Sequence, residues 1–135
     1  MALVPGLRGE AAEEVTAENT ALRYGSGSVE VYATPAVVAL VERAAIAAIA
    51  PYMAAGETTV GTRVEVRHLA ATPVGMQVRA MAELVEVEGR RLLFRAEIYD
   101  EAEKVAEGSH ERFLVEEERF LRKAFAKRKA STLTP

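Results

Sequence analysis

The sequence predicts an α+β fold in which one long apolar helix is wrapped by a curved antiparallel β-sheet. Residues 34–50 are apolar at nearly every position, and most of their side chains are small, which suits a helix enclosed by other elements. From Thr58 onward apolar residues alternate with polar ones, the period of β-strands. The length of 135 residues is sufficient for one domain with a real core, and we expect a single domain over residues 1–135.

The composition narrows the classes of protein. With 50% hydrophobic and 27% charged residues, the chain has the profile of a soluble globular protein. A net charge of −3 gives no overall field that would attract nucleic acid or an anionic membrane. The absence of cysteine excludes disulfides, thiolate nucleophiles and cysteine metal sites. No signal pattern opens the chain, and Glu42-Arg43 interrupts its only long apolar run, so we expect a cytoplasmic protein.

The segment before the helix gives weaker signals. We expect residues 1–10 to be a loose lead-in and Ala11–Asn19 a first strand, with Val15 as its one good β-former. Gly25–Ser28 reads as a flexible loop. It fits neither a nucleophile elbow nor a phosphate-binding loop, because no serine stands between glycines in the required spacing and no Gly-Lys-Ser/Thr follows.

The helix has a start signal in Thr34-Pro35. Thr34 can cap the first turn with its hydroxyl, and Pro35 suits the first helical position, where no amide donor is needed. About sixteen residues at 1.5 Å each give a rod of roughly 24 Å, which crosses a small domain. Pro51 limits its continuation, and Gly56 marks the latest expected stop.

The first long strand is predicted over residues 60–68, and its alternation assigns two faces. The expected core face holds the even positions Val60, Thr62, Val64, Val66 and His68. The expected solvent face holds the odd positions Gly61, Arg63, Glu65 and Arg67. This pattern places His68 on the buried side of the sheet.

Three further strands follow with short reversals. The second strand, after a turn at residues 72–75, has the inward row Met76, Val78, Ala80, Ala82 and Leu84. Glu88-Gly89 predicts a tight hairpin to a third strand with the inward row Leu92, Phe94, Ala96 and Ile98. After a reversal at residues 100–103, Lys104–Val115 forms the last strand. The sequence does not determine which of its side chains face the core, because Gly108 or Ser109 can host a bulge.

A terminal helix is predicted over residues 116–130. It begins with three glutamates and ends in basic residues, which complements the helix dipole. One face carries Phe120, Leu121, Ala124 and Phe125. The long strands leave free sheet edges, so we expect a homodimer or a dimer of dimers formed by sheet extension. The terminal basic run lacks the aromatic or glycine interleaving of a nucleic-acid site.

Three polar residues lie where apolar ones are expected, namely Thr34, Glu42 and His68. A buried unpaired carboxylate costs several kcal/mol, so Glu42 must be paired, protonated or placed in a wet pocket. Carboxylate and imidazole together suffice for acid–base or nucleophilic chemistry on a carbonyl. The structural alternative is a Glu42 salt bridge at a subunit interface, a satisfied core His68 and Thr34 as a helix cap.

His110 is a weaker candidate for a site residue, and a metal site is not expected. His110 precedes the ordinary charged pair Glu111-Arg112, and its facing is unclear. Two distant histidines without cysteine argue against a metal site.

A specific set of residues resembles the fluoroacetyl-CoA thioesterase family of hotdog-fold proteins over residues 33–120. The set is Ala33-Thr34-Pro35, Glu42, Ala50-Pro51-Tyr52, Gly56-Glu57, Gly61-Thr62, His68, Ala70-Ala71-Thr72-Pro73, Glu88-Gly89-Arg90-Arg91 and Gly108 to Arg112. The resemblance implies a hotdog fold, a dimer with active sites at the subunit interface, and hydrolysis of a short acyl-CoA without any cofactor beyond the coenzyme A of the substrate.

The resemblance also implies the site residues. The catalytic Thr, Glu and His of the family fall on Thr34, Glu42 and His68, and its substrate-binding Gly and Arg fall on Gly61 and Arg112. As a hypothesis, Glu42 attacks the thioester, or activates a water or the Thr34 hydroxyl that does so, while His68 moves protons. On one regular helix Thr34 and Glu42 are roughly 12 Å apart, so they would flank the substrate or meet across a dimer, unless the helix begins later.

One segment departs from the family. Residues 24–33, where the fluoroacetate-resistance member of the family carries bulky lid aromatics, contain only Tyr24 and Tyr32 as aromatics. We therefore expect a general short-chain or aromatic acyl-CoA to fit as well as fluoroacetyl-CoA.

Two rival functions stay open. One is a hydratase or dehydratase on the same fold, whose characteristic histidine motif near a helix start is not visible. The other is non-catalytic: a module that binds acyl-CoA for sensing, or a small dimerisation domain.

Overall fold

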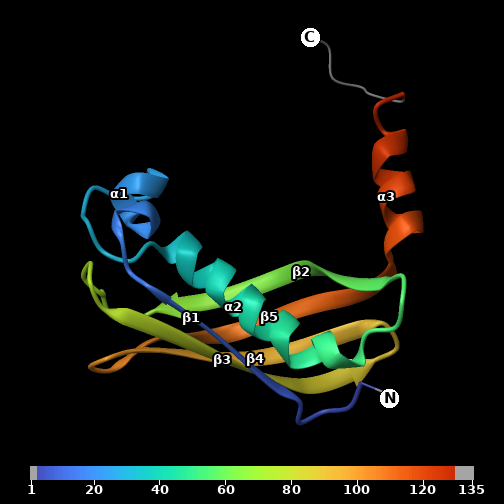
Figure 1. Ribbon diagram of the computed structural model, residues 1–135, viewed down its shortest axis with the longest axis horizontal. Helices are drawn as coiled ribbons and strands as arrows, with labels where there is room; N and C mark the ends of the chain where they lie inside the picture. Colours follow the sequence, from blue (N-terminus) through green and yellow to red (C-terminus); the bar gives the residue numbers. More distant parts are fainter. Residues whose placement is uncertain (1–2, 130–135) are drawn as a thin grey trace.

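The computed structural model describes residues 3–129, which form one five-stranded antiparallel sheet curled around a central helix (Figure 1). The strands are β1 (Arg8–Glu14), β2 (Glu57–His68), β3 (Gln77–Glu88), β4 (Arg91–Asp100) and β5 (Lys104–Glu116). The helices are α1 (Ala21–Tyr24), α2 (Thr34–Ile49) and α3 (Glu117–Ala126), with 3₁₀ turns η1 (Ala17–Asn19) and η2 (Ala50–Tyr52). The strand order β1-β3-β4-β5-β2 leaves β1 and β2 at the edges.

The core helix α2 lies across the inner face of the sheet. Its sheet-facing side is buried and consists of Ala36, Val37, Leu40, Val41, Ala44, Ala45, Ala48 and Ile49. The expectation of a helix enclosed on nearly all sides is wrong for the single chain, since Ile46 on the opposite side is 44% exposed. Thr34–Tyr52 is long and apolar enough to cross a bilayer, but 44% of its most apolar window is buried inside the protein, where it serves as the core helix.

The N-terminal elements differ from the prediction. β1 begins at Arg8, inside the expected loose lead-in, and ends at Glu14, whereas residues 17–19 of the expected strand form η1. Thr16 and Asn19 cap that 3₁₀ turn reciprocally, which ends the strand. Gly9 brings β1 against α2, because a Cβ atom there would lie 2.3 Å from the Ala48 amide nitrogen. Residues 1, 2 and 130 of the predicted terminal segments lie outside the described residues.

The central strands β3 and β4 confirm the predicted alternation. Their inward residues are buried: Val78, Ala80, Ala82 and Leu84 on β3, and Leu92, Phe94, Ala96 and Ile98 on β4. The predicted hairpin turns at Gly89, whose φ of +60° suits a residue without a side chain. The reversal at residues 100–103 is also present, since β4 ends at Asp100 and β5 begins at Lys104.

The edge strand β2 contains a register shift that corrects its predicted facing. Gly61 pairs with Arg112 and Arg63 with Glu111, so Thr62 is an extra residue opposite β5. Val60 and Thr62 therefore lie on the outer face rather than the core face. Val64, Val66 and His68 lie on the inner face as predicted. β5 has a second register shift in its pairing with β4, opposite Ile98 and Tyr99 of β4. The bulge that the sequence allowed at Gly108 or Ser109 is not the position of either shift.

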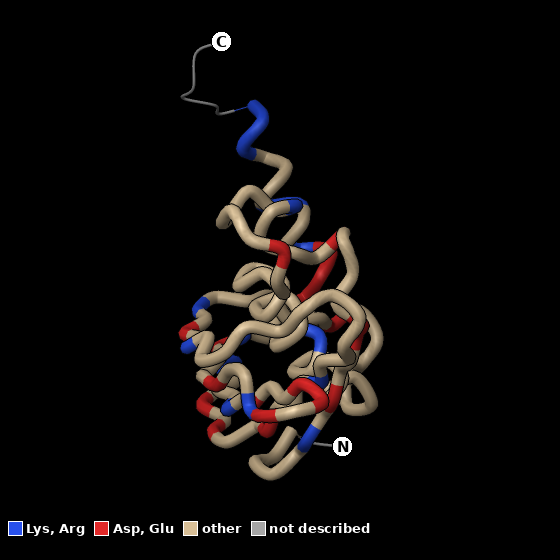
Figure 2. The backbone as a smooth tube through the Cα atoms, turned by 90° about the vertical axis from the view of Figure 1, so that its left-hand side faces the viewer, with Lys and Arg blue, Asp and Glu red and all other residues tan. Residues whose placement is uncertain are grey.

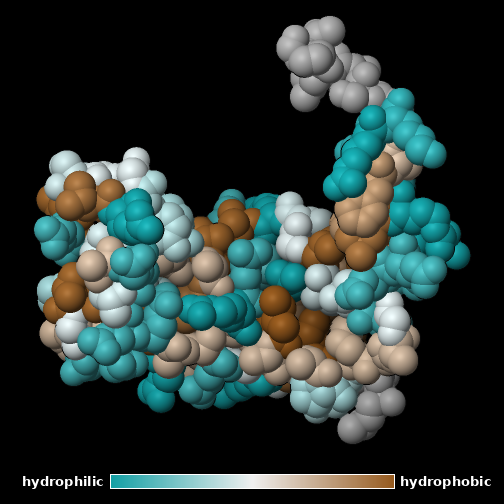
Figure 3. Space-filling view, turned by 45° about the horizontal axis from the view of Figure 1, so that its top comes forward, coloured by the Kyte–Doolittle hydropathy of each residue, from teal (hydrophilic) through white to brown (hydrophobic). Residues whose placement is uncertain are grey.

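The terminal helix α3 stands away from the sheet (Figures 1 and 3). It begins after Glu116, whose carboxylate accepts a hydrogen bond from the Arg119 amide at 2.8 Å. Acidic residues gather at its start and basic ones at its end, as predicted (Figure 2). Its apolar residues Phe120, Leu121 and Phe125 are exposed in the single chain.

Candidate active site

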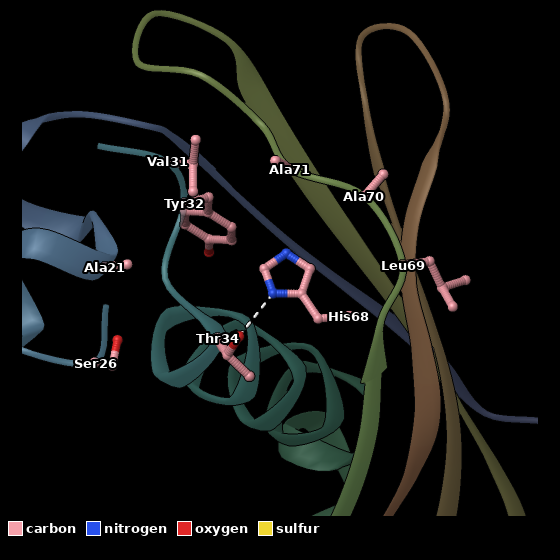
Figure 4. A pocket seen from close by; sticks show the side chains of 9 residues that line it. All are labelled: Ala21, Ser26, Val31, Tyr32, Thr34, His68, Leu69, Ala70 and Ala71. Carbon is pink, nitrogen blue, oxygen red and sulfur yellow. Dashed lines mark hydrogen bonds between the residues drawn. The ribbon is translucent and has the colours of Figure 1, made fainter. Parts of the chain in front are cut away.

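A cleft of about 320 Å³ opens where α2 begins and β2 ends (Figure 4). It is lined by Ala21, Ser26, Val31, Tyr32, Thr34, His68, Leu69, Ala70 and Ala71. Two of the sequence-predicted residues meet in it, because Thr34 Oγ1 lies 2.8 Å from His68 Nδ1. The other lining side chains are mostly small or apolar, so this hydroxyl–imidazole pair is the candidate for chemistry in the cleft.

Thr34 does not have the predicted role of a helix cap. The N-cap of α2 is Ala33, no side chain caps the helix, and Thr34 and Pro35 are its first two residues. The Thr34 hydroxyl is therefore directed at His68 instead of at an amide of the first turn. The start of α2 at Thr34 also excludes the alternative of a helix that begins later.

One ring nitrogen of His68 has no hydrogen-bond partner among the described residues. This atom, Nε2, is buried. Burial lowers the pKa of His68 below its ordinary value, and the nearby backbone of Ala70 acts in the opposite direction. An imidazole that is neutral near pH 7 can accept the proton of the Thr34 hydroxyl or of a water.

Glu42, Gly61 and Arg112 form a second cluster on the inner face of the sheet. Glu42 Oε2 lies 3.7 Å from Arg112 Nη1, with 41% of the Glu42 side chain exposed and only 7% of that of Arg112. A Cβ atom on Gly61 would lie 2.9 Å from Glu42 Oε2, so the missing side chain makes room for the carboxylate. The ion pair here is formed within one chain, unlike the subunit-interface pair considered as the structural alternative.

Sequence reasoning missed Thr59 as a member of this second cluster and named His110 only as a weaker candidate. Arg112 Nε donates to Thr59 Oγ1 at 2.8 Å, and Arg112 Nη1 lies 3.1 Å from His110 Nε2. His110 is 1% exposed and its ring stacks on Phe94 with 6.2 Å between centroids. The signal was the alternation in β5, which places His110 and Arg112 on one face once the register is known.

A third polar group fixes the start of α2. The Tyr32 hydroxyl donates to the Glu13 carboxylate and lies 3.2 Å from the Ala36 carbonyl oxygen. Glu13 also pairs with Arg43 at 3.1 Å. Burial raises the pKa of Tyr32 far above its ordinary value, so the phenol stays protonated and ties β1 to the first turn of α2 beside Thr34.

Within one chain the two clusters are separate. Thr34 and Glu42 are eight residues apart on a regular helix, a rise of roughly 12 Å. Glu42 does not line the cleft that holds Thr34 and His68. Among residues 3–129, no group of three or more His, Cys, Asp or Glu side chains is arranged to hold a metal ion.

Comparison with known proteins gives a consistent result. Residues 15–118 match the family described as fluoroacetyl-CoA-specific thioesterase. A fluoroacetyl-CoA thioesterase of Streptantibioticus cattleyicolor is 45% identical over 91 residues, a match that spans 67% of this chain and 66% of that protein. A solved structure of the fluoroacetyl-CoA thioesterase FlK has a TM-score of 0.87 at 35% identity and covers 100% of both chains. A variant of FlK solved with acetyl-CoA has a TM-score of 0.87 at 36% identity and covers 93% of this chain and 98% of that chain.

The curled sheet around a long helix and the match to solved thioesterases define the class: a hotdog-fold acyl-CoA thioesterase, a hydrolase. The predicted fold class and enzyme class are therefore confirmed. The chain belongs to the fluoroacetyl-CoA-specific thioesterase family.

Proposed function

We propose that this protein hydrolyses a short acyl-CoA thioester to the free acid and coenzyme A, in a homodimer that completes each active site. The observation that carries the proposal is the 2.8 Å contact between Thr34 Oγ1 and His68 Nδ1 in an open cleft. The acetyl-CoA complex of its FlK relative supports a small acyl group. The small residues around the cleft are compatible with the same size.

The proposed site takes its carboxylate from the partner. Glu42 is roughly 12 Å along the helix from Thr34 of its own chain, too far for a hydrogen bond. It is exposed beside β2, whose edge is free in the single chain. Antiparallel pairing of two β2 edges would bring the cleft of one chain toward the middle of the partner helix.

The proposed reaction breaks the bond between the acyl carbon and sulfur. A water, or the Glu42 carboxylate itself, adds to the carbonyl carbon, and His68 moves the proton between the nucleophile and the departing thiolate. The amide of Thr34, the first residue of α2, has no intrahelical acceptor, and Thr34 lines the cleft, so we assign this amide to hold the oxyanion. Water supplies the oxygen of the product acid, and the reaction needs no metal or further cofactor.

Thiol release from a panel of acyl-CoAs tests the activity. We expect turnover by the wild type and losses of at least about 100-fold in Glu42→Ala and His68→Ala. Tight binding without turnover would favour the acyl-CoA sensor. Hydration of an enoyl-CoA without thiol release would favour the hydratase.

Mixed dimers test where the carboxylate comes from. Glu42→Ala and His68→Ala chains are each inactive, but a dimer of one chain of each kind contains one intact site if Glu42 crosses the interface. Refolding an equimolar mixture should then restore about one quarter of wild-type activity. A site built within one chain would restore none.

The nucleophile is distinguished by isotope labelling. In a single turnover in ¹⁸O water, a mixed anhydride that water opens at the Glu42 carbonyl leaves label in the Glu42 carboxylate and sends unlabelled carboxylate oxygen into the product acid. Label in Glu42 therefore identifies attack by the carboxylate, whereas direct attack by water puts the label only in the product acid. Mass spectrometry of the peptide that contains Glu42 reads the difference.

A further inference from the structure

The buried imidazole of His110 has no role in the reaction proposed above, although it contacts a member of the site. Its Nδ1 lies 2.9 Å from the Arg63 carbonyl oxygen and its Nε2 lies 3.1 Å from Arg112 Nη1. Arg63 directly follows the register shift of β2, where the extra residue disturbs the regular ladder. The ring is thus held at both nitrogens between the two strands.

The two partners fix the protonation of the ring. A carbonyl oxygen only accepts, so Nδ1 carries the hydrogen, and a guanidinium only donates, so Nε2 is the acceptor. A doubly protonated ring would put a donor against a donor and a cation against Arg112. Burial and the charge of Arg112 both lower the pKa of His110, while the Arg63 carbonyl and Glu42 act in the opposite direction.

Arg112 is anchored without any carboxylate within hydrogen-bond distance. Its Nε donates to Thr59 Oγ1 at 2.8 Å, its Nη2 to the Thr59 carbonyl at 3.0 Å, and its Nη1 to His110. All three acceptors are neutral, so its positive charge remains available to Glu42. The 3.7 Å between Arg112 Nη1 and Glu42 Oε2 is longer than a hydrogen bond, which leaves the carboxylate oriented but not bound.

We propose that His110 is a positioning residue of the thioesterase site, which occupies Arg112 Nη1 and thereby keeps Glu42 oriented but free to react. The inference rests on the proposed function, because it takes Glu42 as the reacting carboxylate. Without an acceptor at the His110 Nε2 position, Arg112 Nη1 has Glu42 as its nearest anionic acceptor. A direct charge-assisted hydrogen bond would then draw the carboxylate away from the substrate.

Two amide substitutions at this position separate the two contacts. In His110→Gln the side-chain oxygen reaches the Nε2 position and can accept from Arg112. In His110→Asn the amide reaches only the Nδ1 position, so it keeps the bond to Arg63 but not the one to Arg112. With acetyl-CoA as the probe, we expect His110→Gln to stay within about 5-fold of wild-type kcat and His110→Asn to lose about 100-fold with little change in KM.

The melting temperature Tm of both variants controls for a structural role. Equal losses of kcat in the two variants, or losses that follow Tm rather than the amide position, would overturn the proposal. So would a His110→Asn enzyme with wild-type kcat while Glu42→Ala is inactive. A Glu42→Ala enzyme with unchanged turnover would instead remove the proposed function.

A spectroscopic measurement tests the inference without turnover. In ¹⁵N spectra of the wild type, we expect His110 to show a protonated Nδ1 and an unprotonated Nε2, with the Arg112 Nη1–H signal in slow exchange. That arginine signal should persist in His110→Gln and broaden in His110→Asn. A His110 ring protonated at Nε2 would overturn the proposal, even for a protein that hydrolyses no acyl-CoA.

Discussion

Gly61 lies directly beside the Glu42 carboxylate, and a Cβ atom built on it would lie 2.9 Å from Glu42 Oε2. The same atom would lie 3.3 Å from His110 Cε1 and 3.4 Å from Arg112 Nη1. The nearest neighbour is the end of a flexible side chain, so an alanine can be accommodated if the carboxylate moves. The space left by Gly61 therefore determines where Glu42 stands.

We expect Gly61→Ala to lower kcat by about 10- to 100-fold, because a displacement of about 1 Å at a reacting group is costly. The melting temperature should change little, since only the tip of Glu42 must shift. Steady-state kinetics with acetyl-CoA and a thermal melt check both expectations. Wild-type kcat in Gly61→Ala would show that the position of Glu42 is not critical.

Gly9→Ala is the contrasting substitution. A Cβ atom there would lie 2.3 Å from the Ala48 nitrogen and 2.4 Å from the Ala44 oxygen, both backbone atoms of α2. Because neither atom can move without the helix, we expect a loss of about 1–3 kcal/mol in unfolding free energy. Urea denaturation measures it. A stability equal to that of Gly61→Ala would contradict this reading of the contact between β1 and α2.

Thr34→Val removes the hydroxyl and keeps the shape. We expect a loss of about 100-fold in kcat with an unchanged melting temperature, because the hydroxyl contacts His68 and caps no helix amide. Thr34→Ser is the matched control and should retain most activity. If Thr34 were the helix cap that the sequence predicted, Thr34→Val would instead cost about 1 kcal/mol of stability.

The pH dependence follows from the lowered pKa values of His68 and His110, which burial causes in both cases. In the proposed reaction neutral His68 accepts a proton, so kcat/KM should fall only below pH 6.5, at a lower pH than for a free imidazole of ordinary pKa about 6.5. The unfolded chain binds more protons below pH 6.5 than the folded chain, so stability also falls as the pH drops there.

Thermal melts between pH 8 and pH 5 check the predicted loss of stability at low pH. We expect His68→Gln to reduce the decline of Tm with falling pH, because one of the two perturbed imidazoles is gone. An acid limb of activity above pH 6.5 would contradict a neutral His68 as the proton acceptor.

Regular alternation made β3 and β4 predictable from the sequence, since their inward rows continue without interruption through the core. In β2 the alternation predicted the wrong face for Val60 and Thr62, because Thr62 is an extra residue. Nothing in the local sequence marks the shift between Gly61 and Arg63. The short elements η1 and α1 were missed because three or four residues carry no measurable period.

The elements that carry the candidate site residues were predictable, but the geometry between these residues was not. Thr34 and Glu42 lie on the predicted helix and His68 on the predicted inner face. That Thr34 contacts His68 depends on where α2 begins relative to the end of β2, which is a tertiary property. His110 was undervalued because its orientation depends on the register of β5. In the proposed dimer, the approach of Glu42 to the cleft depends on a second chain, which no pattern within one sequence describes.

Thr62, the extra residue of β2, is a position where the length of the strand can change without changing which face the later side chains occupy. Because Thr62 and Arg63 together stand opposite Glu111, removing Thr62 would leave every later side chain on its present face. The strand would straighten, and the Arg63 carbonyl would rejoin the regular ladder instead of serving His110. Deletion of Thr62 would thus preserve the architecture but abolish the activity. A deletion in a regular strand instead moves every later side chain to the opposite face and disrupts the fold.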